Sequence, residues 1–385
     1  MSGARGLRYR AAVSGLLLSC MPLFSAAGDA QDRRGREEKR DVLMEMDLGA
    51  VSLPAPVDGP RVTAEDLPGR AVLFVFSSSN PGDRNWSEFL VRTTRKYADP
   101  APPGGLVVLF VQSAKTTDAK WFPRDGGCPV VSFFPEDAFS MPGFAFVGLP
   151  RIILFDGDGR IVSHFIVDGR DLAGNSIHQV AGPPCTPEVV RKAAATSGSV
   201  LRAGTSLDGG GEARKLVEGA LTSAPLAPLL RSLRDRAKGG KGDAGAILQG
   251  FKEYLEAQRA LVERNIVPNP FLAQRALNRL VAQTQGDELG APFEALRKRL
   301  SQDSRFQEEL KGAEALAKVR GLAAKIKWGL LDPDAPRPRE EIAAVRRGVE
   351  EVVRKHGKTQ AGRMAEELKL AWTQWAAKAI DPLPW

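Results

Sequence analysis

Cysteine and histidine are scarce in this chain of 385 residues, which contains three of each. Three thiols cannot build a disulfide-dense scaffold and are too few for a zinc site with four thiolate ligands. Three imidazoles argue against a histidine-rich metal centre, so we expect neither a metal nor another cofactor. Hydrophobic residues make up 43% of the chain and charged residues 26%, which is a globular composition. It excludes a disordered protein and a protein with many membrane spans.

The first 30 residues have the pattern of an export signal. Three arginines precede an apolar stretch at residues 11–24. This stretch is shorter than the ~20 apolar residues that a membrane span needs, so we expect no span in the mature chain. Small residues favour cleavage after Ala27. Alternatively, residues 17–20 are similar to a bacterial lipobox, which would place a lipid anchor at Cys20. Both routes predict an exported protein, periplasmic or extracellular, in a compartment that favours disulfides.

The composition changes at residues 197–211, which are rich in Gly, Ser and Thr and end in three glycines. This segment has the character of a linker between a β-rich front half and a back half with helical periodicity. The length is also that of a two-domain chain. We therefore expect five parts: a signal peptide (1–27), a flexible leader (28–42), an α/β domain (43–197), a linker (198–211) and an all-α helical domain (212–385).

Basic residues are concentrated in the back half, where residues 201–385 hold 32 Lys and Arg against 24 Asp and Glu. A basic surface can attract nucleic acid or an anionic membrane. Here acidic residues interrupt the basic ones throughout, and no aromatic stacking motif lies beside them. We interpret the charges as solvated helix faces and expect no nucleic-acid partner.

The front half contains two continuous apolar runs of strand length, residues 71–76 and 106–111. Such runs are typical of central strands that are buried on both faces. Residues 151–155 and 161–165 flank a glycine-rich turn at 156–160, which predicts an antiparallel hairpin. The order of these elements predicts a mixed sheet with helices on its faces.

Two helix starts are marked in the front half. After the first apolar run, Asn80 is a suitable N-cap, Pro81 suits the first helical position, and Asp83 would face the positive end of the helix dipole. Later in the chain, Cys185 precedes residues 186–188 (TPE), which also predict a helix start.

Residues 57–195 together resemble the thioredoxin-like fold, in its redoxin branch. Residues 58–62 (DGPRV) and 66–70 (DLPGR) are similar to the entry of that branch. Residues 148–162 (GLPRIILFDGDGRIV) are similar to the block that carries the family's cis-proline, which would be Pro150. The resemblance implies an α/β thioredoxin-like domain in which this proline faces the start of the first helix.

The chain departs from that family where the thiol chemistry should be. The family's Cys-x-x-Cys falls on residues 80–83, which are Asn-Pro-Gly-Asp and cannot form the thiolate that disulfide exchange needs. Arg151 follows Pro150, where the family often has a small hydroxyl residue. The resemblance thus implies a binding or scaffold module with a peptide-facing groove. The positions of this groove are Asn80, Pro81, Gly82, Asp83, Leu149, Pro150 and Arg151.

Two alternatives remain open for the mature chain. Cys128 and Cys185 could form a structural disulfide, or they could be a relocated redox pair in a thiol–disulfide oxidoreductase. The chain could also be an envelope-associated structural protein whose helical domain binds the partner. A protein or a peptide is the expected partner in the binding interpretations.

Helical stripes of apolar residues follow residue 212. One runs through residues 306–326, where Ser304 and Gln307 predict a capping box, and others run through 342–352 and 364–379. The stripe with Trp372 and Trp375 is expected to be core. These patterns predict a helical bundle or an irregular helical array of no recognised family.

Overall fold

The computed structural model describes residues 46, 48, 51–56, 61–77, 104–112, 130–133, 151–167, 177–181, 185–201, 211–240, 242–329 and 339–380. The chain divides into two units, Met1–Asp41 and Val42–Trp385. All described residues belong to the second unit, which combines a mixed sheet with a helical region. This confirms an α/β part followed by an α-helical part.

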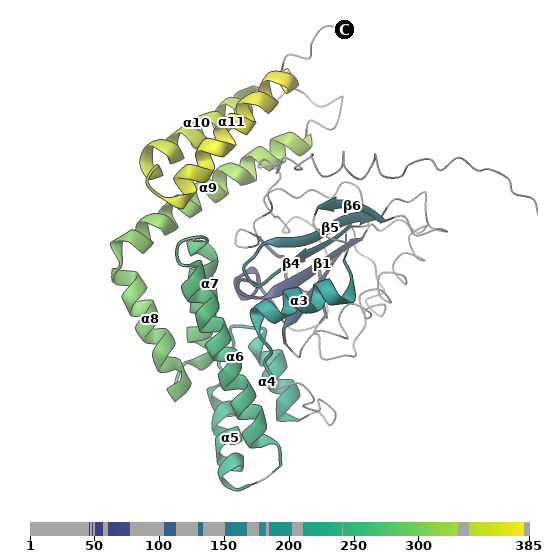
Figure 1. Ribbon diagram of the computed structural model, residues 1–385, viewed down its shortest axis with the longest axis vertical. Helices are drawn as coiled ribbons and strands as arrows, with labels where there is room; N and C mark the ends of the chain where they lie inside the picture. Colours follow the sequence, from purple (N-terminus) through teal and green to yellow (C-terminus); the bar gives the residue numbers. More distant parts are fainter. Residues whose placement is uncertain are drawn as a thin grey trace, which may run out of the picture. The chain divides into compact units, whose positions relative to one another are not determined.

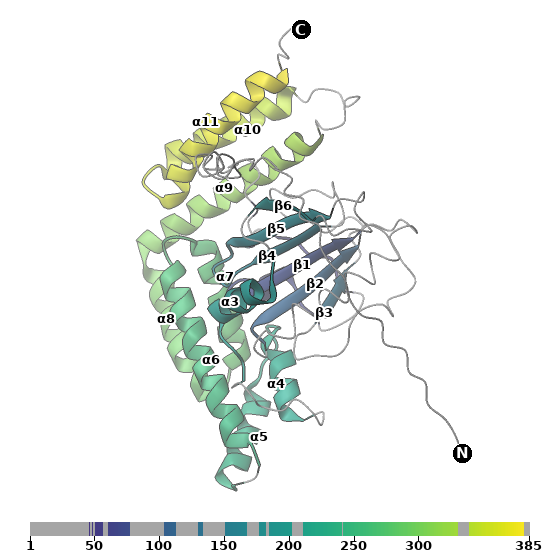
Figure 2. The same cartoon turned by 45° about the vertical axis from the view of Figure 1, so that its right-hand side comes forward.

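The sheet has the strand order β3-β2-β1-β4-β5-β6 in the described residues. Strand β1 is parallel to β2, and β2 to β3, whereas β4, β5 and β6 continue from β1 as antiparallel neighbours. Figure 2 shows the six strands in this order. The strands are β1 (Ala71–Ser77), β2 (Leu106–Gln112), β3 (Val130–Phe133), β4 (Arg151–Phe155), β5 (Ile161–Val167) and β6 (Ile177–Ala181).

The predicted hairpin joins β4 and β5, as expected. Its turn is closed by the Asp156 amide, which donates to the Arg160 carbonyl at 2.9 Å. Gly159 has φ 74° there, a left-handed conformation that residues with a Cβ rarely adopt. The glycine-rich sequence therefore sets the geometry of this turn.

Both faces of the central strands are buried, which explains their unbroken apolar sequences. Helix α3 (Pro187–Ser197) covers one face, which we call the α3 face (Figure 1). Its core contains alternate residues of β1, namely Ala71, Leu73 and Val75, together with residues of β2 and β4. The intervening residues of β1, Val72, Phe74 and Phe76, point to the opposite face.

The opposite face packs against the chain that leads into β1. Its cluster includes Leu48, Val51, Val62 and Leu67, and the short 3₁₀ helix η3 (Ala64–Asp66) lies within this segment. Leu221, which lies beyond the predicted linker, belongs to the same cluster. The sheet core is therefore completed by residues from both sides of the segment 198–211.

The region after residue 211 is helical in its described parts. Its elements are α4 (Glu212–Ala220), α5 (Ala227–Lys238), α6 (Ala244–Asn265), α7 (Pro270–Thr284), η7 (Glu288–Gly290), α8 (Ala291–Gln302), α9 (Ser304–Gly329), α10 (Arg339–His356) and α11 (Gln360–Ile380). None of the described helices is both long enough and apolar enough to cross a bilayer.

Two apolar clusters hold these helices together. One joins α4–α8 with Val200, Leu201 and Phe306. The other joins the second half of α9 with α10 and α11, which lie side by side in Figures 1 and 2. Trp372 is 2% exposed in this second cluster, as its stripe predicted. The predicted capping box at the start of α9 is wrong, because the Asp303 carboxylate accepts from the Arg305 and Phe306 amides instead.

Candidate functional site

The predicted groove is described at one position, Arg151. Its other positions, as well as Cys20 and Cys128, lie outside the described residues. The groove as a whole therefore stays a prediction, and what the structure describes is the part of the sheet next to it. The undescribed groove positions are Asn80, Pro81, Gly82, Asp83, Leu149 and Pro150.

Arg151 begins β4 and is 3% exposed. It pairs with Phe76 at the end of β1, and paired residues share a face of the sheet. Its guanidinium therefore projects on the face opposite α3. Burial lowers the pKa of Arg151 to about 10, so the side chain keeps its charge at neutral pH. A buried cation thus lies directly after the position of the predicted cis-proline.

His164 lies on the same face of the sheet. It pairs with Ile153 of β4, whose side chain belongs to the cluster opposite α3. Burial lowers the pKa of His164 to about 4, and the charge of Arg151 contributes in the same direction. The imidazole is therefore neutral at pH 7, and its Nε2 is buried without a hydrogen-bond partner. At neutral pH, this face of the sheet therefore carries the charged guanidinium of Arg151 and the neutral imidazole of His164.

Cys185 lies on the α3 face. It carries a free thiol, is 8% exposed and packs in the cluster with residues of β1, β4 and α3. Burial raises the pKa of Cys185 to about 12, against a weaker opposing effect of the Ser163 hydroxyl. The predicted helix start at Thr186 is confirmed, but burial outweighs its electrostatic benefit to the thiol. Cys185 is unbonded in the structure and Cys128 lies outside the described residues, so a relocated redox pair of the two cysteines stays a prediction.

We expect the Cys185 thiol to react slowly with iodoacetamide in the folded protein. In a Cys20→Ser/Cys128→Ser background at pH 8, alkylation should be at least about a hundredfold slower than in urea-unfolded chain. The cause is twofold, since burial limits access and suppresses the thiolate. Mass spectrometry of quenched samples measures the rate. Equally fast labelling of folded and unfolded chain would contradict the buried, protonated state.

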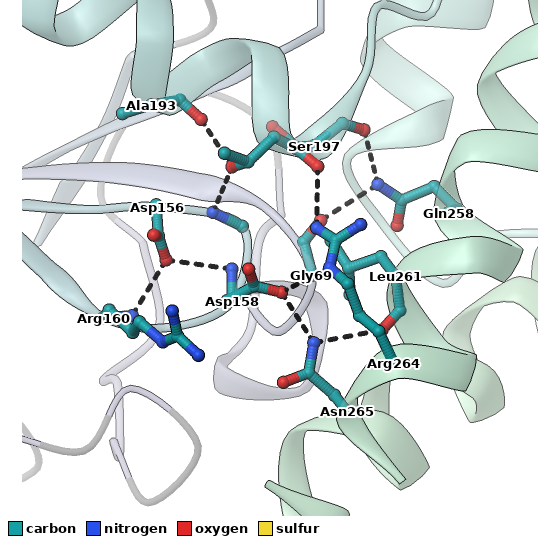
Figure 3. Close-up of polar contacts among 12 residues, drawn as sticks. Gly69, Asp156, Asp158, Arg160, Ala193, Ser197, Gln258, Leu261, Arg264 and Asn265 are labelled. Carbon is teal, nitrogen blue, oxygen red and sulfur yellow. Dashed lines mark hydrogen bonds and ion pairs between the residues drawn. The ribbon is translucent and has the colours of Figure 1, made fainter. Parts of the chain in front are cut away.

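A buried polar network links the sheet region to the helices. We call it the polar seam and define it by six side chains, each at most 2% exposed: Asp66, Arg70, Ser197, Tyr254, Gln258 and Arg279. Gln258 of α6 is at its centre, where its Nε2 donates to the Gly69 carbonyl at 2.9 Å and to the Ser197 carbonyl at 2.6 Å. Figure 3 shows Gln258 reaching from its helix to both carbonyls.

Arg279 of α7 makes the other main connections in the seam. Its Nη1 donates to the Asp66 carbonyl at 2.7 Å and to the Pro68 carbonyl at 2.6 Å, and its Nη2 donates to Gln258 Oε1 at 2.6 Å. Burial lowers the pKa of Arg279 to about 9, and the charge of Arg70 adds to this effect. Arg70 in turn donates to the Tyr254 hydroxyl at 3.1 Å.

The hairpin turn extends this connection towards solvent. Asp158 accepts from Asn265 Nδ2 at 2.7 Å and from Arg264 Nε at 2.9 Å, so the turn is bound to the end of α6 (Figure 3). The Gly157 amide donates to Thr196 Oγ1 at 2.6 Å. Burial raises the pKa of Asp156, whose Oδ1 accepts from two amides of the same turn. The carboxylates of this turn therefore have structural partners, and no metal-binding cluster is found among the described side chains.

The sequence reasoning missed the seam, although a signal was present. Gln258 and Arg279 interrupt the apolar faces of α6 and α7 and are buried there among leucines and alanines. A polar residue in such a position needs a buried partner, but the sequence does not reveal which group that partner is.

A scan against models of protein families, a search of curated proteins and a search of solved structures each found no match.

Proposed function

We propose that this is an exported protein whose thioredoxin-like domain has lost thiol–disulfide chemistry and acts as a binding or scaffold module. The strand directions support the resemblance on which the proposal depends. A parallel pair β1–β2, a strand β4 that runs antiparallel to β1 and continues into the β4–β5 hairpin, and a helix α3 that packs on the sheet agree with what the family implies.

The state of Cys185 is the observation that carries the proposal. A disulfide-exchange enzyme needs an accessible thiolate. This thiol is 8% exposed and has a raised pKa, and it lies across the sheet from Arg151. The sequence at the predicted active-site helix start, residues 80–83, contains no thiol. Among the described residues the scaffold keeps its sheet and offers no accessible thiol, which suits it to binding a protein or a peptide.

A disulfide-reduction assay tests the loss of chemistry. With insulin as the substrate and dithiothreitol as the reductant, the purified protein should not accelerate turnover above the reductant alone. Turnover that disappears on Cys128→Ser or Cys185→Ser would contradict the proposal and favour the oxidoreductase alternative.

A gain-of-function variant tests the resemblance itself. If residues 80–83 occupy the family's motif, Asn80→Cys/Asp83→Cys should introduce measurable insulin reduction, because a helix N-terminus favours the thiolate. The single variant Asn80→Cys is the matched control and should remain inactive as a dithiol reductant. A folded double variant without activity would remove the basis for placing the groove there.

A further inference from the structure

The backbone just before β1 depends on side chains from distant helices. The carbonyls of Asp66, Pro68 and Gly69 accept hydrogen bonds from Arg279 and Gln258, and all five residues are buried. Buried carbonyls need a partner, and the separation in sequence to the donors is 189 to 213 residues. These three carbonyls therefore have their side-chain donors only when α6 and α7 are in place.

Apolar packing crosses the same boundary. A Cβ added at Gly69 would lie 3.2 Å from the Cβ of Ala276, so α7 approaches this backbone closely. Leu221 packs in the sheet cluster opposite α3, and Val200 and Leu201 pack in the cluster of α4–α8. The two regions thus share their cores as well as their hydrogen bonds.

Helices α10 and α11 are organised differently. They pack on each other and on α9 from Glu309 onward, where the Glu309 carboxylate accepts from the Gln360 amide at 2.8 Å. Their apolar cluster shares no residue with the cluster of α4–α8. Trp372 is at its centre and donates from Nε1 to the Ile342 carbonyl at 3.3 Å, a contact within the same helical group. Among the described residues, none of the hydrogen bonds of the seam involves α10 or α11.

We infer that the described residues, all of which follow Asp41, form two cooperative folding units whose boundary lies inside α9. In the first unit, helices α4–α8 complete the sheet region and open together with it. In the second unit, the group formed by the end of α9, α10 and α11 opens independently. This organisation goes beyond the proposed function, because it predicts which helices transmit a change to the sheet.

The buried thiol of Cys185 provides a local probe of the sheet, because it lies under α3. The experiment uses the full chain with Cys20→Ser/Cys128→Ser, so that Cys185 is the single thiol, and measures its alkylation rate at low urea concentrations. Gln258→Leu removes three hydrogen bonds of the seam. Two of them join Gln258 to the carbonyls of Gly69 and Ser197 on the sheet side, and the third joins it to Arg279. We expect this change to increase the Cys185 rate by about ten- to a hundredfold.

Matched variants make the test specific. Gln249→Leu replaces an exposed glutamine of the same helix, bonded to Glu253, and should leave the rate within about twofold. Trp372→Ala should loosen α9–α11, as seen by hydrogen exchange of those helices, and should also leave the Cys185 rate within about twofold. If Gln258→Leu fails to fold, Tyr254→Phe removes only the bond to Arg70 and should raise the rate by about two- to tenfold.

Two results would overturn the inference. A Cys185 rate that is unchanged by Gln258→Leu and Tyr254→Phe would show that the sheet opens without the helices. A rate raised by Trp372→Ala as much as by Gln258→Leu would show one single cooperative unit. The first result leaves the proposed function untouched, since the disulfide-reduction assay is independent of it.

Discussion

Replacing Arg279 by methionine should lower the free energy of unfolding by about 3–5 kcal/mol. The side chain donates to three buried acceptors, the carbonyls of Asp66 and Pro68 and the Gln258 amide oxygen. Each acceptor left without a partner costs about 1–3 kcal/mol. Removing a buried cation close to Arg70 offsets part of this loss, since the charge of Arg70 already lowers the pKa of Arg279. Urea denaturation followed by circular dichroism measures the change.

Arg275→Met is the matched control for this prediction. Arg275 belongs to the same helix, but its side chain is 20% exposed and forms a surface ion pair with Glu65 at 3.3 Å and a cation–π contact with Phe271. Exposed pairs of this kind contribute about 0–1 kcal/mol. If the two substitutions destabilised the protein equally, water would be satisfying the three acceptors and the seam would not be a stabilising network.

Acid should destabilise the protein through His164. The pKa of His164 in the folded state is about 4, below its ordinary value of 6.5. Between these values the unfolded chain binds a proton that the folded chain does not, so stability falls as the pH drops from about 6.5 to 4. The full loss is about 3 kcal/mol, and the stability is fully present above pH 6.5. Protonation would place a second buried charge beside Arg151.

Comparison with His164→Leu isolates this effect, because carboxylates titrate in the same range in both proteins. The free energy of unfolding, measured in urea from pH 7.5 to 4, should fall more steeply for the wild-type chain than for the variant. The difference between the two curves should grow by about 3 kcal/mol on acidification. Parallel curves would mean that His164 is hydrated in the folded state and titrates normally.

The central strands could be predicted because their sequences follow from burial on both faces. The runs at 71–76 and 106–111 match β1 and β2, and the hairpin around residues 156–160 matches β4 and β5. Strands β3 and β6 were not predicted. They are short, they lie at the edges of the sheet, and β6 includes two polar residues within five. Edge strands carry a weaker apolar signal, because fewer of their neighbours exclude water.

The seam could not be predicted in the same way, because its partners are far apart in the sequence. Gln258 and Arg279 are identifiable as polar residues on apolar helix faces, yet their acceptors are backbone carbonyls, which every residue possesses. Local rules also failed at the start of α9, where Asp303 and not Ser304 caps the helix. Both residue types are good caps, so the choice between neighbours depends on how α8 ends.

The bonds of Arg279 have a consequence for biosynthesis. The Pro68 carbonyl emerges from the ribosome 211 residues before the guanidinium that satisfies it. At roughly 5–20 residues per second, this interval is on the order of ten to forty seconds. The last described strand ends at Ala181, so in the later part of this interval all six described strands have been synthesised while the Pro68 carbonyl still lacks this partner. During that period we expect the nascent chain to remain a substrate for holding chaperones.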